Sequence, residues 1–244
     1  MDLTPLPFAI AAAAGNVLGA AAVVRGARRG LAAIQVLLAF GAGFMLALVL
    51  TGVLPAVFRE APPGGEGPAG LLVLSGYLLV HVTQHTLTPH FHFGEETHEV
   101  PRSAGYGALA GLGLHAFFDG VAVASGFLVS SSLGVLFFLA ILVHKLPEGV
   151  SVASVVLASG LGRTRAIQAG VVLGVTTIVG ALFTGAIAAL ARHGLALAAG
   201  VTLYVAASNL VPEVQARRGA RVTAAFLGGA LAFLLLRIAG PAAG

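Results

Sequence analysis

The chain of 244 residues contains no cysteine, and only 9% of its residues are charged. Without cysteine there is neither a disulfide framework nor a thiolate metal site. Soluble domains carry about 25% charged and about 45–50% apolar residues, whereas this chain is 58% hydrophobic. The shortage of charge excludes a water-soluble globular protein, and the apolar content excludes disorder. The sequence therefore predicts an integral membrane protein.

Long apolar runs take the place of charge. Eight runs are long enough to cross a bilayer as helices, and they are too uniformly apolar for the strands of a barrel. They cover residues 6–24, 31–57, 69–88, 104–129, 133–160, 166–191, 194–211 and 221–239. The loops between them are too short to fold alone. We therefore expect one all-α transmembrane domain over 1–244, and we expect its first run to be a mature span, because no basic segment precedes it.

Basic residues are distributed unevenly between alternate loops. One set of loops contains nine arginines, namely Arg25, Arg28, Arg29, Arg102, Arg163, Arg165, Arg217, Arg218 and Arg221. The other set contains three, Arg59, Arg192 and Arg237. Because basic residues accumulate in cytoplasmic loops, the imbalance predicts that both termini are extracellular or periplasmic. The net charge of +4 then reflects topology rather than binding of nucleic acid.

Five ionisable residues lie deep inside two consecutive apolar runs. They are His115, Asp119, His144, Lys145 and Glu148. A charge at the bilayer centre costs about 2.5–3.5 kcal/mol, so this group needs mutual partners, a water-filled cavity or a metal. The segments HAFFDGVAVASGFL (115–128) and HKLPEGVSVASVVL (144–157) are near-copies in which Asp119 aligns with Glu148. In each copy the histidine and the acid are four residues apart and share one helical face.

If these two helices pack together, two imidazoles and two carboxylates converge. Such a set suits a four-coordinate divalent ion such as Zn²⁺. The ligands alone do not separate Zn²⁺ from Cd²⁺, Mn²⁺ and Fe²⁺, although the absence of sulfur argues against Cu⁺. Only neutral imidazole binds metal, so we expect binding to weaken below about pH 6.5. A simple interhelical hydrogen bond is the alternative, which the duplication of the motif disfavours.

The two motifs resemble the metal-binding motifs of the ZIP (Zrt/Irt-like) divalent metal transporters. HxxxDG stands at 115–120 and HKxPEG at 144–149, while TGVLPAVFRE (51–60) and YVAASNLVPEV (204–214) look like the ends of the family's second and seventh helices. Eight spans and a His-rich loop after the third also match the family. The resemblance implies transport of Zn²⁺ or a similar ion into the cytoplasm without ATP. It implies a primary site between the fourth and fifth spans, formed by His115, Asp119, His144 and Glu148.

Four positions depart from the family's pattern. Ala116 and Lys145 stand where many members have ligands for a second metal. We therefore expect a single-metal site in which the Lys145 ammonium takes the place of the second ion. Ser208 and Asn209 replace the His or His-Glu pair that the seventh span often offers. Together with Glu213, they are candidates for residues along the ion pathway.

Histidines gather near the end of the third apolar run and in the loop that follows, at about 89–103. They are His81, His85, His90, His92 and His98. Two interpretations remain open. The histidines bind or sense metal at a cytoplasmic exit, or the loop is merely polar and ends the helix.

Two other functions would use the same site. An intramembrane metallohydrolase needs an open coordination position and a separate general base, but both carboxylates are expected to be ligands and the chain has no HExxH motif. A metal-gated channel is the second alternative. We expect a transporter rather than an enzyme, with no catalytic cofactor, whose partners are divalent metal ions and the lipid bilayer; a homodimer is left open. Abundant Ala, Gly and Arg with one Lys suggest a GC-rich bacterial gene, and hence the cytoplasmic (inner) membrane.

Overall fold

The computed structural model describes residues 3–26, 31–87, 102–216 and 219–239, and all regular structure in these ranges is helical. In chain order the elements are α1 (Leu6–Val24), α2 (Leu31–Leu48), the π-helix η2 (Val49–Val53), α3 (Leu54–Arg59), α4 (Glu66–Leu87), α5 (Arg102–Val129), α6 (Ser131–Ala158), α7 (Arg163–Ala186), α8 (Ala188–Tyr204), the π-helix η3 (Val205–Leu210), α9 (Val211–Gln215) and α10 (Ala220–Ala239).

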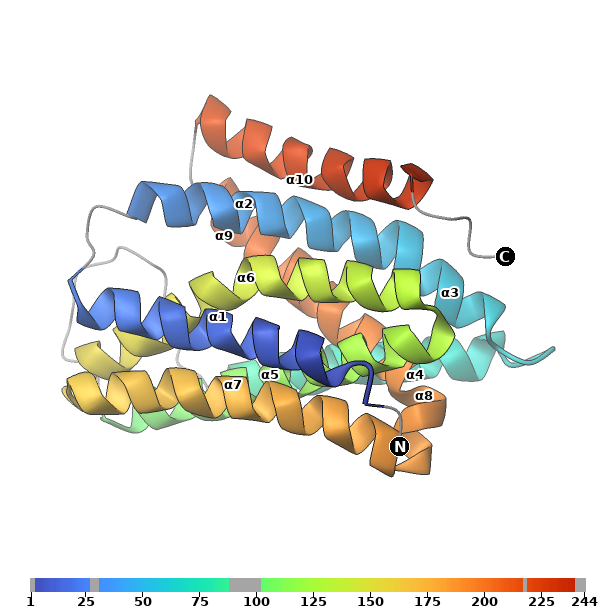
Figure 1. Ribbon diagram of the computed structural model, residues 1–244, viewed down its shortest axis with the longest axis horizontal. Helices are drawn as coiled ribbons and strands as arrows, with labels where there is room; N and C mark the ends of the chain where they lie inside the picture. Colours follow the sequence, from blue (N-terminus) through green and yellow to red (C-terminus); the bar gives the residue numbers. More distant parts are fainter. Residues whose placement is uncertain (1–2, 27–30, 88–101, 217–218, 240–244) are drawn as a thin grey trace.

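The predicted all-helical membrane fold is confirmed. Seven helical stretches in the described ranges are long and apolar enough to cross a membrane, and two of them combine several elements: α2–η2–α3 and α8–η3–α9. Helix α4 adds an eighth of spanning length, 22 residues, although its second half is more polar because it contains His81, Gln84 and His85. Helix α1 begins and α10 ends at the same end of the bundle (Figure 1), as an even number of crossings requires.

The boundary between the sixth and seventh spans was predicted wrongly. Helix α7 ends at Ala186 rather than at 191, and α8 begins at Ala188 rather than at 194. Only Ile187, with an extended backbone (φ −110°, ψ 111°), separates them. Arg192 therefore lies within α8 and not in a loop. The apolar run crosses Ile187 with no charged residue to mark the break, so the pattern placed the boundary at the first charge.

Each of the two π-helical segments ends just before a Leu-Pro or Val-Pro pair. Proline has no N–H to donate to the carbonyl four residues earlier, and for Pro55 and Pro212 those carbonyls belong to Thr51 in η2 and Ser208 in η3. A wider π turn is one way in which a helix accommodates such a gap. The Arg237 side chain of α10 donates a hydrogen bond to the Thr51 carbonyl oxygen. Arg237 therefore satisfies a backbone acceptor that Pro55 leaves without its usual donor.

The helices pack in two groups. Helices α1 and α5 each pack extensively against both α6 and α7, while α10 packs along α2 and α4 packs along α8. Close approach depends on glycine: a Cβ added at Gly149 would meet the backbone of Asn16 in α1, and one added at Gly120 would meet the backbone of Thr177 in α7. The groups meet where α5 contacts α8 and α2 contacts α6. In Figure 1, α6 runs between α1 and α2, so the charged segment of the chain lies inside the bundle.

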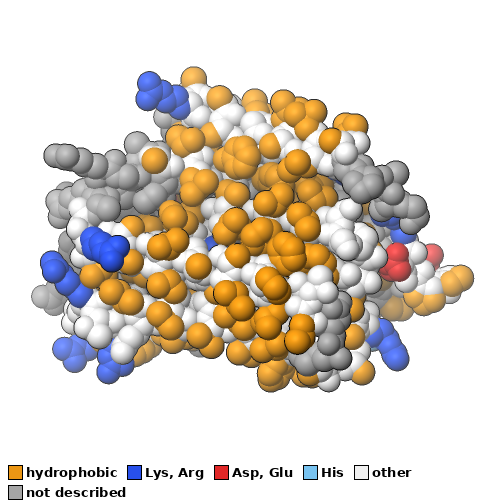
Figure 2. All heavy atoms as spheres, viewed as in Figure 1, with side chains coloured by type: hydrophobic (Ala, Val, Ile, Leu, Met, Phe, Trp, Pro, Cys, Tyr) orange, Lys and Arg blue, Asp and Glu red, His pale blue; other side chains and the backbone are white. Residues whose placement is uncertain are grey.

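The outer surface matches a lipid environment. Figure 2 shows apolar side chains spread across the middle of one face, with Lys and Arg gathered mainly toward its two ends. Leu71, Leu227, Leu231 and Ile238 are each more than half exposed. Apolar exposure of this extent marks a membrane or protein contact surface.

Candidate metal centre

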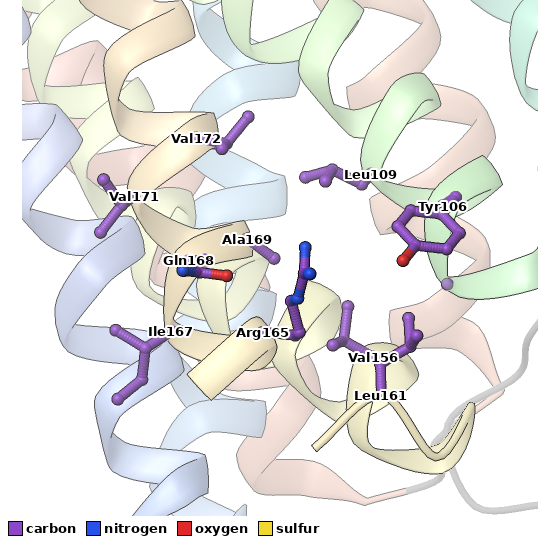
Figure 3. Close-up of a pocket in the computed structure, with 11 residues that line it drawn as sticks. Tyr106, Leu109, Val156, Leu161, Arg165, Ile167, Gln168, Ala169, Val171 and Val172 are labelled. Carbon is purple, nitrogen blue, oxygen red and sulfur yellow. The ribbon is translucent and has the colours of Figure 1, made fainter. Parts of the chain in front are cut away.

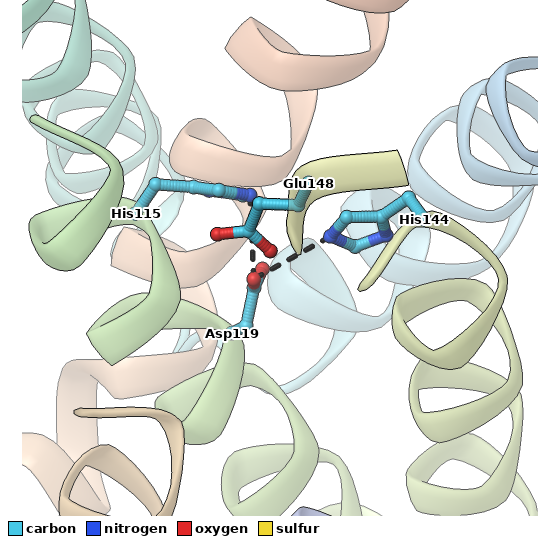
Figure 4. Close-up of side chains that lie close together, drawn as sticks. All are labelled: His115, Asp119, His144 and Glu148. Carbon is cyan, nitrogen blue, oxygen red and sulfur yellow. Dashed lines mark hydrogen bonds and ion pairs between the residues drawn. The ribbon is translucent and has the colours of Figure 1, made fainter. Parts of the chain in front are cut away.

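The four residues predicted as metal ligands converge in the structure. His115 and Asp119 come from α5 and His144 and Glu148 from α6, and all four are buried. One ligand atom from each lies within 4.8 Å of the others. Figure 4 shows the side chains pointing toward a common centre between the two helices. The i,i+4 spacing in each copy of the motif produces this arrangement, because it puts both side chains of a helix on the face that meets its neighbour.

Asp119 is the hub of the cluster. Its Oδ2 lies 3.3 Å from Nε2 of His115 and 3.4 Å from Nε2 of His144. In a tetrahedral zinc site with metal–ligand distances of about 2.0–2.2 Å, neighbouring ligand atoms lie about 3.3–3.6 Å apart. These two separations therefore already suit a shared metal. The widest separation among the four ligand atoms, up to 4.8 Å, must shorten before all four groups can bind one ion.

The ring of His144 is oriented by its own helix. Its Nδ1 lies 3.0 Å from the carbonyl oxygen of Ala140, and since a carbonyl only accepts, Nδ1 carries the proton. In the neutral ring Nε2 then presents its lone pair toward Asp119. Two acceptors that face each other at this distance favour a cation between or beside them. A backbone contact of this kind also fixes the ring of metal-binding histidines.

Lys145 provides a cation within the cluster. Its Nζ lies 2.6 Å from Oδ2 of Asp119 and 2.6 Å from Oε2 of Glu148, and its side chain is fully buried. The ammonium thereby pairs with both carboxylates, which would be costly to bury unpaired. Among the described residues, Oε1 of Glu148 and Nδ1 of His115 have no hydrogen-bond partner. The other expected substitute, Ala116, lies in an apolar cluster with Ala20 and Val152.

Helix α1 packs against α6 at the level of the cluster. A Cβ added at Gly15 would lie 2.9 Å from the Cβ of Lys145, so α1 and α6 are in close contact at this level. The next residue, Asn16, is fully buried, and the two polar atoms of its amide have no hydrogen-bond partner among the described residues. Sequence reasoning missed Asn16. Its signal was weak: a single amide inside the first apolar run, without a periodic companion.

Two of the predicted pathway residues, Ser208 and Asn209, contact α4. The Oγ of Ser208 and the hydroxyl of Tyr77 are 2.8 Å apart, and Nδ2 of Asn209 donates to Oε1 of Gln84 at 3.0 Å. These two contacts join η3 to α4. Tyr77 and Gln84 were not predicted, because neither belongs to a motif of the chain.

Two of the five predicted exit histidines are also in α4. The ring centroids of His81 and His85 are 4.1 Å apart, and the ring of His81 lies against that of Tyr204. Glu213 lies in α9, half-buried. His90, His92 and His98 are outside the described residues, as is nearly all of the predicted His-rich loop.

The sequence is similar to known proteins over a large part of its length. The model of a family described as ZIP Zinc transporter matches residues 94–237, which include both motifs. Zinc transporter ZIP13 of Pongo abelii is 29% identical over 194 residues, which cover 73% of this chain and 58% of that protein. Zinc transporter ZIP13 of Gallus gallus is 36% identical over 106 residues, 40% of this chain and 28% of that protein.

A third relative, zinc transporter ZIP6 of Homo sapiens, is 30% identical over 135 residues, 52% of this chain and 18% of that protein. The chain thus spans less than two thirds of the length of these relatives. All three are named transporters and none an enzyme, which agrees with the expectation of a non-enzyme and disfavours a metallohydrolase. With more than half of its length matched to the family model, the chain belongs to the ZIP zinc transporter family.

Proposed function

We propose that the protein carries a divalent metal ion, with Zn²⁺ the preferred substrate, into the cytoplasm through a site formed by His115, Asp119, His144 and Glu148. The observation that carries the proposal is the convergence of two imidazoles and two carboxylates within 4.8 Å in buried positions of two helices. Such ligands suit Zn²⁺, but they discriminate only weakly against Cd²⁺, Mn²⁺ and Fe²⁺. The excess of arginines in one set of loops indicates which side of the bundle is cytoplasmic, and the inward direction rests on the resemblance to the ZIP family.

We infer that the site takes one metal at a time. Two carboxylates and the Lys145 ammonium give the site a formal charge of −1 when empty and +1 with a divalent ion. A second divalent ion about 4 Å from the ammonium would be repelled by about 8 kcal/mol at an effective dielectric constant of 20. At the same dielectric constant one free carboxylate about 4 Å from that ion would offset this repulsion, but both carboxylates of the site already contact the first ion and the ammonium. Lys145 thus takes the place of a second ion, and its positive charge cannot leave the site because it is part of the chain.

Binding requires a rearrangement around Lys145. Its ammonium lies 2.6 Å from one oxygen of each acid, Asp119 and Glu148. A metal that binds these oxygens would lie beside the ammonium, so we expect it to displace the ammonium from at least one of them. The ammonium returns when the ion leaves, so that neither carboxylate is left unpaired inside the membrane.

Movement of one helix group against the other would give access to the site from each side in turn. The group that contains the site is α1, α5, α6 and α7, and the other group contains η3 and α4. Ser208 and Asn209, with Glu213 further along, would face the ion as it leaves. His81 and His85 would then bind the ion weakly near the cytoplasmic end, because an ion held by only two imidazoles is released quickly.

The test is metal uptake into proteoliposomes without ATP. Wild type, the double variant His144→Ala, Glu148→Ala and a control, Thr184→Ala, are each given Zn²⁺, Cd²⁺, Mn²⁺ and Fe²⁺. Thr184 is also buried in a span, but its hydroxyl donates to the carbonyl oxygen of Gly180 in its own helix and to no other described residue. We expect saturable uptake by wild type and control and none by the double variant.

Other outcomes separate the alternatives. Uptake that does not saturate, at rates well above those of a carrier, would indicate a metal-gated channel. Wild-type protein that is folded and binds metal stoichiometrically yet takes up none would contradict transport and return attention to a metallohydrolase. Uptake retained by the double variant would contradict the site.

A further inference from the structure

A crevice of about 410 Å³ lies between the first turns of α5 and α7. Gly105, Tyr106 and Leu109 of α5 form one wall, residues 165–172 of α7 the opposite wall, and Val156 and Leu161 the floor (Figure 3). None of its lining residues belongs to the metal cluster. Its α5 wall is about ten residues, roughly 15 Å along the helix, from His115 and Asp119. A cavity of this size is within the usual range for small-molecule sites, which is about 300–1,000 Å³.

The crevice is apolar except for three groups. These are the guanidinium of Arg165, the amide of Gln168 and the hydroxyl of Tyr106. Figure 3 shows the Arg165 side chain extending into the space between the two helices, with Tyr106 across from it. None of the lining residues is acidic, and no described residue forms a hydrogen bond or ion pair with Arg165. A guanidinium that faces an apolar cavity and pairs with no described residue favours an anion, and its fork of donors matches phosphate.

The crevice extends from the membrane–water boundary toward the bilayer centre. Arg165 lies in the first turn of α7, near Arg163 and near Arg102 at the start of α5, so this end is at the membrane–water boundary. From there the α7 wall continues into the bilayer through Val171 and Val172, which are 41% and 45% exposed. The crevice is therefore cationic at its outer end and apolar toward the bilayer centre. This is the polarity of a phospholipid read from its phosphate to its acyl chain.

We propose that this crevice binds one anionic phospholipid, whose phosphate contacts Arg165 and whose acyl chain lies along Leu109 and Val172. The hydroxyl of Tyr106, across the crevice from Arg165, is placed to donate to the same phosphate. The N-terminus of α7 acts in the same direction, because its N-cap, Gly162, offers no side-chain acceptor to the first N–H groups and such an end attracts anions. Basic pockets between spanning helices on the cytoplasmic side are typical sites for anionic headgroups.

Native mass spectrometry of the purified protein tests this proposal. Wild type is titrated with phosphatidylglycerol and with phosphatidylcholine that carry the same acyl chains, alongside Arg165→Gln and a control, Arg163→Gln. The control makes the same charge change two residues away, on roughly the opposite side of the helix, at a residue that does not line the crevice. We expect wild type and control to prefer phosphatidylglycerol by about fivefold, the effect of one basic contact with an anionic lipid, and Arg165→Gln to show almost no preference.

Three results would overturn the proposal. Wild type without a preference for phosphatidylglycerol has no such site. Equal losses in Arg165→Gln and Arg163→Gln indicate diffuse attraction between the arginines and the anionic surface. Displacement of phosphatidylglycerol by inorganic phosphate at equal concentration indicates an anion site in which the apolar walls take no part. Transport is not measured, so none of these outcomes bears on the proposed uptake of metal.

Discussion

The ammonium of Lys145 lies 2.6 Å from Oδ2 of Asp119, across the contact between α6 and α5. The same carboxylate oxygen faces His115 and His144. A covalently attached cation therefore competes with the metal for the central oxygen of the cluster. Replacement of Lys145 is therefore the most direct test of how the cluster binds and releases a metal ion.

Replacing Lys145 with methionine should make stability depend on metal. The variant keeps the volume of the side chain but leaves Asp119 and Glu148 without their cation. Removing one partner from a buried pair costs about 3–5 kcal/mol, so we expect a lower Tm in chelator and recovery of most of the loss in Zn²⁺. Melting in detergent, with and without metal, measures both. A Tm that Zn²⁺ leaves unchanged in the variant would show that the carboxylates do not bind metal.

Replacing Lys145 with glutamate should raise the number of metal ions bound. The change removes the repulsive charge and adds an oxygen ligand beside the cluster, so we expect two Zn²⁺ per chain in place of one. Elemental analysis of the purified protein gives the ratio. If Lys145→Glu still binds one ion, Lys145 does not stand in the place of a second metal.

Gly149 should not tolerate alanine. A Cβ there would meet the carbonyl oxygen of Asn16, which is backbone and cannot rotate away. Overpacking of this kind costs about 1–3 kcal/mol, and it would separate α6 from α1 beside Glu148. We expect a lower Tm and slower Zn²⁺ uptake. Gly113→Ala is the matched control, because a Cβ at that helical position has no neighbour within 4 Å and should leave stability unchanged or raise it by about 0.4–1 kcal/mol. Equal behaviour of the two variants would refute the close contact.

The hydrogen bond between Asn209 and Gln84 should be measurable by a double-mutant cycle. Both side chains lie within the bundle, on η3 and α4. Side-chain hydrogen bonds between spanning helices contribute about 0.6 kcal/mol on average and up to about 1.7 kcal/mol. We expect a coupling of this size between Asn209→Leu and Gln84→Leu in the free energy of unfolding. Additive effects of the two substitutions would mean that the contact does not join the helices.

The sequence predicted those parts of the molecule that follow from residue spacing and hydropathy. Eight apolar runs account for the helices, and the repeated i,i+4 pairs account for the meeting of His115 and Asp119 with His144 and Glu148. The break at Ile187 was missed because backbone conformation changes there without a change in polarity. The π-helical turns were missed because they depend on where the carbonyls of Thr51 and Ser208 find partners. Tyr77, Gln84 and Asn16 act singly, and pairings between distant spans leave no periodic trace in one sequence.

Helix α1 has no ionisable side chain, yet its glycines lie against the residues that bracket the cluster: a Cβ at Gly15 would press on Lys145 and one at Gly19 on the carbonyl oxygen of Leu146. Genetic screens for loss of metal accumulation should therefore recover inactive alleles in this helix as well as in the motifs. Such alleles would encode bulkier residues at positions that never touch the cargo. Their second-site suppressors should map to small residues of α6 and α7 rather than to histidines or acids.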